Sequence, residues 1–189
     1  MRLKNTLAPF ALAIAAAVAL VSASSSWAHG DPPRADFNLH RLLAEVGEAT
    51  RPFIDIGNAL AAGYTKFPDL SGDCVDQPGQ GGMGIHYVHS ALVGDAVLDP
   101  FKPEFLVYHE ARHGRHELVA LEYVVFAPLW DALHPQPPVL FGHPMHLVRT
   151  PNRYGTSMPF YELHVWLYEH NPNGLFNDWN PTFNCQHKR

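Results

Sequence analysis

Two histidines and one glutamate, far apart in the sequence, are the residues best suited to chemistry in this chain. His86, Glu122 and His164 each lie in a stretch rich in Val, Leu, Tyr and Phe, which predicts a β-strand. Two imidazoles and a carboxylate are a recurrent ligand set for Zn, Fe or Cu, with positions left open for water or substrate. If the strands bring these side chains together, the sequence predicts a divalent transition-metal site that could activate water or polarise a carbonyl.

Alternation along the predicted strands indicates which side chains share a face. In residues 117–126 both faces are apolar, so this strand is expected to be central and Glu122 to be a buried carboxylate with a partner or a raised pKa. The same alternation places Leu118 on the face of Glu122. In the strand predicted over residues 83–93, His86 alternates with Gly84 and Val88, so it also lies on a defined face.

Residues 161–168 have one apolar face, and His164 lies on the other, which is polar and aromatic. In the strand predicted over residues 104–110, Tyr108 and Glu110 share one side. Either could join the two histidines and the glutamate in a concavity of the sheet, and Glu110 is therefore a further metal-ligand candidate.

Other interpretations of these residues remain open. His86 and His164 could be core histidines hydrogen-bonded to Glu122 or Tyr108, or a His–Glu pair could do acid–base chemistry without a metal. The sequence predicts a His/Glu polar site inside a mostly apolar pocket that binds a small ligand or a metal ion, and it leaves catalysis open. The alternatives are a non-enzymatic carrier or sensor of a small apolar molecule, and an envelope interaction protein in which these residues are only structural.

The first 28 residues have the pattern of a signal peptide. Arg2 and Lys4 precede an apolar run over residues 7–21, and the small residue Ala28 ends a cleavage site. We expect a soluble exported protein, periplasmic or extracellular, because no later stretch is long enough to span a membrane. Cleavage would make His29 the first residue, and its amine and imidazole could chelate copper.

The charge, the cysteines and the remaining histidines limit the kinds of partner and bond that the chain can form. The net charge is −5 with no cluster of Lys or Arg, which argues against nucleic acid as a partner. Cys74 and Cys185 are expected to form a disulfide after export. The thirteen histidines form no run, and the pairs His113/His116 and His143/His146 are interpreted as solvated loop residues. Nothing in the sequence indicates the oligomeric state.

The order of the predicted elements points to an α+β fold. Residues 29–35 are expected to be extended and residues 36–189 to form a single domain, which begins with one bent helix or two helices up to residue 64. These pack on a curved antiparallel sheet of about four strands, with a long Pro-rich connection over residues 128–159 before the last strand. The strands are predicted over residues 83–93, 104–110, 117–126 and 161–168.

Three motifs carry a resemblance to other proteins. They are GMGIHY at residues 82–87, LVALEY at residues 118–123 and LHVW at residues 163–166. With these motifs the chain resembles a family of exported proteins of uncharacterised activity, over residues 61–185. The resemblance implies one exported domain that uses His86, Glu104, Glu122, His164 and the two cysteines. It implies no activity, cofactor or substrate.

Overall fold

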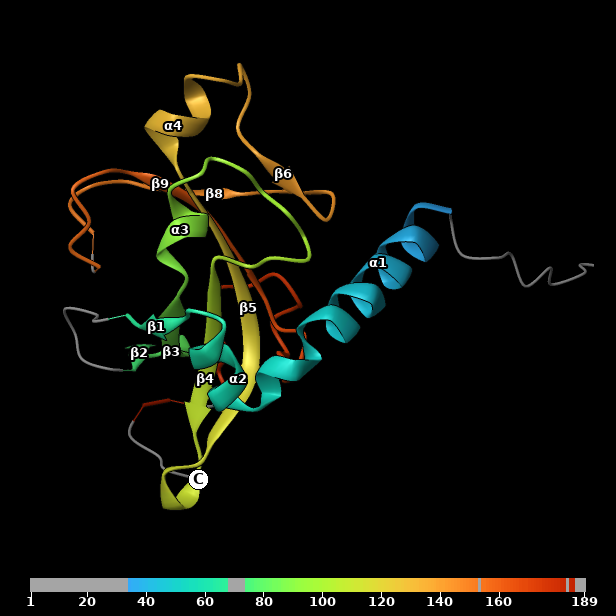
Figure 1. Cartoon of the computed structure of the whole chain (residues 1–189), viewed down its shortest axis with the longest axis vertical. Helices are drawn as coiled ribbons and strands as arrows, with labels where there is room; N and C mark the ends of the chain where they lie inside the picture. The colour runs from blue at the N-terminus through green and yellow to red at the C-terminus, as the bar shows by residue number, and fades with distance from the viewer. Residues whose placement is uncertain (1–33, 68–73, 153, 183, 186–189) are drawn as a thin grey trace, which may run out of the picture. The chain divides into compact units, whose positions relative to one another are not determined.

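An antiparallel sheet forms the centre of the fold, which the computed structural model describes over residues 34–67, 74–152, 154–182 and 184–185. Its seven strands are in the order β1-β3-β4-β5-β9-β8, and β2 also pairs with β3 (Figure 1). The strands are β1 (Thr65–Lys66), β2 (Val75–Gln77), β3 (Gly81–Val88), β4 (Phe105–Glu110), β5 (His116–Phe126), β8 (His146–Val148) and β9 (Phe160–Val165). The predicted leader and His29 lie outside the described residues.

Helical segments precede the sheet and connect its strands. They are α1 (Arg34–Thr50), η1 (Arg51–Ile54), α2 (Ile56–Ala61), α3 (Ser90–Val93), η2 (Arg112–Gly114) and α4 (Ala127–Asp131). A separate two-stranded sheet pairs β6 (Val139–Leu140) with β7 (His143–Pro144). The structure therefore has the predicted α+β character. None of the helices in the described residues is long and apolar enough to cross a membrane.

The structure corrects several predicted boundaries. Residues 34–35, predicted to be extended, belong to α1, which begins at Arg34, and the rest of that predicted segment lies outside the described residues. The first long strand was predicted to continue to residue 93, but β3 ends at Val88, which pairs with the first residue of β4. Residues 90–93 form the helix α3 instead. The Pro-rich connection over residues 128–159 contains most of α4 and all of β6, β7 and β8. Short strands β1, β2 and β8 enlarge the predicted four-stranded sheet.

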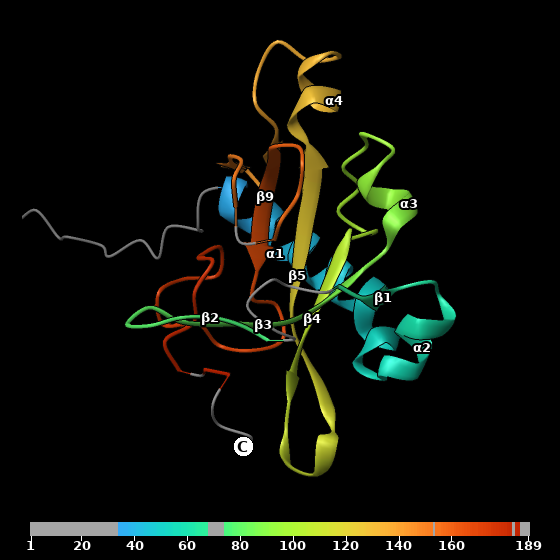
Figure 2. The same ribbon diagram turned by 90° about the vertical axis from the view of Figure 1, so that its left-hand side faces the viewer.

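Helices α1 and α2 cover one face of the sheet, and α3 packs on the other through Val93. The spacing of apolar residues along α1 places Leu43 and Val46 on the sheet side, and Ala59 of α2 joins them in the main core. Figure 2 shows α1 running behind β5 and β9. The strands contribute Ile85, Tyr87, Leu106, Tyr108, Leu121, Tyr123, Leu163 and Val165 to this core. Burial of each Leu or Val side chain contributes about 1.5–3 kcal/mol to stability.

An irregularity in β5 changes the face of one predicted residue. Val107 pairs with Ala120 and Tyr108 with Leu118, so Val119 is an extra residue in β5. Leu118 consequently joins the helix-covered core, while Val119 packs on the other face with Val107 and Ala120. The predicted placement of Leu118 beside Glu122 is wrong for this reason.

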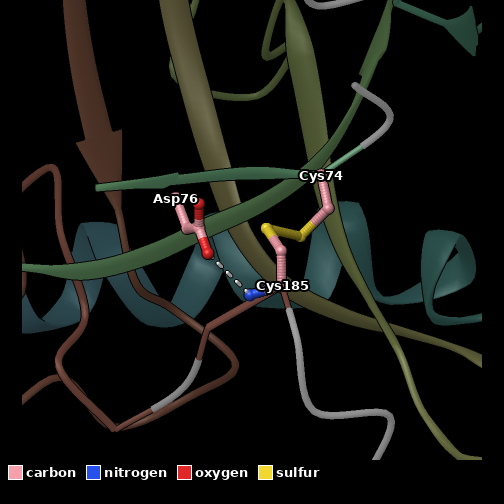
Figure 3. Close-up of a disulfide and its surroundings, with 3 residues drawn as sticks. All are labelled: Cys74, Asp76 and Cys185. Carbon is pink, nitrogen blue, oxygen red and sulfur yellow. Dashed lines mark hydrogen bonds between the residues drawn. A yellow bond between two sulfur atoms is a disulfide. The ribbon is translucent and has the colours of Figure 1, made fainter. Parts of the chain in front are cut away.

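The C-terminal segment is fixed to the start of the sheet. Cys74 and Cys185 form the predicted disulfide across 111 positions of sequence, and the backbone N–H of Cys185 donates to Asp76 Oδ2 at 3.2 Å (Figure 3). Gly81 has a φ of +116°, and a Cβ there would lie 2.0 Å from the carbonyl oxygen of Asn180. Only glycine allows this close approach of two backbone segments.

Candidate metal centre

His86, Glu122 and His164 come together on the sheet face opposite α1 and α2. They belong to β3, β5 and β9, and Glu122 lies directly across from His164 in the β5–β9 ladder. Strand β4 lies between His86 and the other two residues, and Phe105 of β4 pairs with Glu122. One nitrogen of each ring and one carboxylate oxygen lie within 4.8 Å of one another. The structure therefore places the three predicted residues at ligand spacing.

These side chains are almost completely buried. His86 is 2% exposed, Glu122 3% and His164 0%, and 3.3 Å separates His86 Nε2 from Glu122 Oε2. In the part of the chain that the structure describes, neither ring nitrogen of His164 has a hydrogen-bond partner. A buried polar atom without a partner is costly, so such atoms commonly mark the place of a bound ion or water.

Burial favours the neutral form of both Glu122 and His164. It raises the pKa of Glu122 well above its usual range, and the nearby carboxylates Glu162 and Asp178 raise that pKa further. Burial also lowers the pKa of His164 well below its usual value, with a smaller effect from His86. A neutral imidazole is the form that binds metals, and a cation beside Glu122 would restore its carboxylate.

Aromatic rings enclose this group. The Trp166 ring lies 4.8 Å from that of His164 between centroids, and its Nε1–H donates to the carbonyl of Asn177 at 2.6 Å. The rings of Phe105 and Tyr154 approach His86 at 6.1 and 6.2 Å. These contacts fix the imidazoles and lower the local polarity, which strengthens any electrostatic interaction with an ion.

A cavity of about 430 Å³ reaches two of these residues. His86 and Glu122 are part of its wall, and most of the other wall residues are aromatic or aliphatic, among them Phe67, Phe105, Phe126, Tyr154, Phe160 and Val124. Threonines, Ser90 and Lys66 supply the remaining polar groups. A small molecule in this cavity would therefore contact mainly carbon atoms and meet polar atoms at His86 and Glu122.

Tyr108 and Glu110 do not join this group. The hydroxyl of Tyr108 donates to the carbonyl of Phe53 at 2.6 Å, on the helix-covered face. Glu110 pairs with His116 at the far end of β4. Alternation correctly placed these two residues on one side, but that side is the one away from His86. Neither belongs to the ligand group found among the described residues.

Glu104 is a further buried carboxyl that is not a member of the ligand group, although its charge acts on Glu122. It is 1% exposed, and its Oε2 accepts a hydrogen bond from the backbone N–H of Val124 at 3.0 Å. Burial raises its pKa to about 8, although hydrogen bonds from the backbone N–H groups of Val124 and Glu104 lower it. Glu104 directly precedes β4, and its side chain provides the hydrogen-bond acceptor for a backbone N–H of β5.

A second ligand group adjoins the first and was missed in the sequence. It consists of His146, Glu162 and Asp178, whose donor atoms also lie within 4.8 Å of one another. His146 belongs to β8 and not to a loop, although its side chain is exposed as expected. Alternation along residues 161–168 places Glu162 on the same face as His164, which the structure confirms, but no sequence pattern indicates Asp178.

Comparison with known proteins adds no relative. No family model, curated protein or solved structure matches this chain. Its function is therefore argued from the arrangement of its own residues.

Proposed function

We propose that this chain is an exported protein that binds a divalent transition-metal ion through His86, Glu122 and His164. The ion lies at the inner end of the apolar cavity, where a small molecule can reach it. Two imidazoles and a carboxylate suit Zn, Fe or Cu, and three protein ligands leave positions for water or another ligand.

One observation carries this proposal. His164 is fully buried, and in the described chain both of its ring nitrogens have no hydrogen-bond partner. A core histidine with a purely structural role normally donates one ring N–H to an acceptor. An ion bound by His164 would satisfy one nitrogen and would explain why a polar ring lies beside Glu122 and His86 in an apolar wall.

The open side of the site determines its chemistry. His86 and Glu122 are in the cavity wall, so the free coordination positions of an ion would face the cavity. An ion in such a position can activate a bound water or polarise a carbonyl of a bound molecule. The aromatic wall would exclude bulk water and favour substrates with an apolar body and one polar group.

Metal content of the purified protein tests the proposal. Protein exported by the host cell is dialysed with Zn²⁺, then metal-free buffer, and analysed by inductively coupled plasma mass spectrometry. We expect bound zinc in the wild type and much weaker retention in His86→Ala, His164→Ala and Glu122→Gln. His143→Ala is the matched control, because it removes an exposed histidine that belongs to neither ligand group. Equal zinc retention in Glu122→Gln, His164→Ala and the wild type would refute the site.

A second function is favoured by the lining of the cavity. Its aromatic and aliphatic wall could hold a small apolar molecule without any metal, with His86 and Glu122 as hydrogen-bonding anchors. In that case apolar ligands raise the melting temperature of protein kept in EDTA. Ser90→Trp at the cavity wall should abolish this shift, because the exposed Ser90 tolerates a large ring that fills the cavity. A shift that requires zinc would instead favour the metal-centred function.

A further inference from the structure

The second ligand group is built across the sheet next to the first. His146 lies directly opposite Glu162 in the β8–β9 ladder, so both side chains are on the same face. His146 Nδ1 is 3.7 Å from Glu162 Oε1 and 3.6 Å from Asp178 Oδ2. Glu162 is 5% exposed, whereas 67% of the His146 side chain is accessible. The group therefore has a buried carboxylate at its base and an imidazole at its open side.

The two ligand groups adjoin each other on the same sheet face. Glu162 and His164 are two positions apart on β9 and share the face that Glu122 occupies on β5. The charges of Glu162 and Asp178 both act on Glu122. Three carboxyl groups of the two ligand groups therefore lie near one another, and their negative charges repel.

From this arrangement we propose that His146, Glu162 and Asp178 bind a second divalent ion, and that Glu122 and Glu162 link it to the first. The chain would then hold a two-metal centre with three imidazoles and three carboxylates. This inference rests on the proposed function for the first ion. Ions in such centres lie roughly 3.5–4 Å apart, a separation that carboxylates can bridge.

The chemistry of the ligands fits this proposal. Carboxylates that crowd one another in a buried place gain most from a cation, because it offsets their mutual repulsion. Mixed imidazole and carboxylate ligands suit Zn²⁺, Mn²⁺ or Fe²⁺. The first ion would be enclosed by aromatic rings, and the second would lie nearer to solvent at His146. We therefore expect the second ion to exchange faster.

Zinc stoichiometry with single variants tests the second site. His146→Ala removes an exposed side chain and should leave the fold intact. Equilibrium dialysis with Zn²⁺ should give about two ions per wild-type chain and about one per His146→Ala chain. His143→Ala is the matched control, since it removes an exposed histidine three positions away and should retain both ions. Loaded with Mn²⁺, the wild type should show the exchange-coupled electron paramagnetic resonance signal of a metal pair, and His146→Ala should not.

The possible results separate the two proposals. One ion in both the wild type and His146→Ala, lost in His164→Ala, overturns the second site and leaves the proposed function standing. One ion that is lost in His146→Ala but retained in His164→Ala overturns the proposed function and the metal pair together. Two ions without exchange coupling overturn the carboxylate link. Absence of bound zinc from the wild type overturns both proposals.

Discussion

The buried carboxyl of Glu104 should make the stability of this protein fall as the pH rises. Burial raises its pKa from 4.5 to about 8, and the charges of Asp95 and Asp99 contribute in the same direction. The folded chain therefore binds a proton at this position that the unfolded chain has already lost above pH 4.5. The perturbation is Glu104→Gln, which keeps an oxygen for the backbone N–H of Val124 and removes the titration.

The size of the effect follows from the pKa difference. Each tenfold change in proton affinity corresponds to about 1.4 kcal/mol, so a change from 4.5 to about 8 corresponds to at most about 5 kcal/mol. Because the folded-state pKa is the higher one, this stabilisation is complete below pH 4.5 and is lost as the pH rises to about 8. Above that value the folded state contains a buried carboxylate and the contribution is absent.

Urea unfolding of both proteins between about pH 4 and pH 9, followed by tryptophan fluorescence in EDTA, measures this contribution. The free energy of unfolding of the wild type, minus that of Glu104→Gln, should fall by several kcal/mol as the pH rises across this range. Groups that titrate in both proteins cancel in the difference, except for those, such as Glu122, on which the charge of Glu104 acts. A flat curve for Glu104→Gln, or one of opposite slope, would refute the reasoning.

Three further substitutions test the fold and the faces of the sheet. Gly81→Ala should lower the free energy of unfolding by more than about 2 kcal/mol and speed proteolysis of the C-terminal segment, because a Cβ clashes with Asn180; unchanged cleavage would contradict this. Replacing Cys74 and Cys185 with serine should cost up to about 4–5 kcal/mol in urea unfolding, since the closed loop is long, and an unchanged midpoint would contradict it. Tyr108→Phe should cost about 1 kcal/mol without changing zinc content; loss of zinc would contradict the face assigned to Tyr108.

Periodicity predicted the long elements of the fold but not the short ones. The helical spacing of apolar residues in α1 and the alternation in β4 and β5 each extend over several residues, so the pattern identifies them. Strands β1, β2 and β8 have two or three residues each, which is too few for alternation to be recognised. The extra residue Val119 also left no signal, because an apolar strand looks the same with or without a bulge.

The sequence predicted which face of its own strand each candidate ligand occupies, but not which faces come together. Alternation assigned His86, Glu122 and His164 to faces within their own strands, but only the pairing register shows that these faces coincide. The same limit explains why Tyr108 was considered a candidate although its face is covered by the helices. His146 and Asp178 lie on a short strand and in the C-terminal segment, where spacing carries no information about tertiary contacts.

The distribution of the ligands over the sheet has a kinetic consequence. His86, Glu122 and His164 are on strands β3, β5 and β9, so the ligand set is complete only after β3, β4, β5 and β9 have all paired. Contacts at such long sequence separation form late, because the chain must close large loops before they are made. An ion at this position would bind the native state and not the folding nucleus. It would therefore lengthen the lifetime of the folded protein and leave its folding rate unchanged.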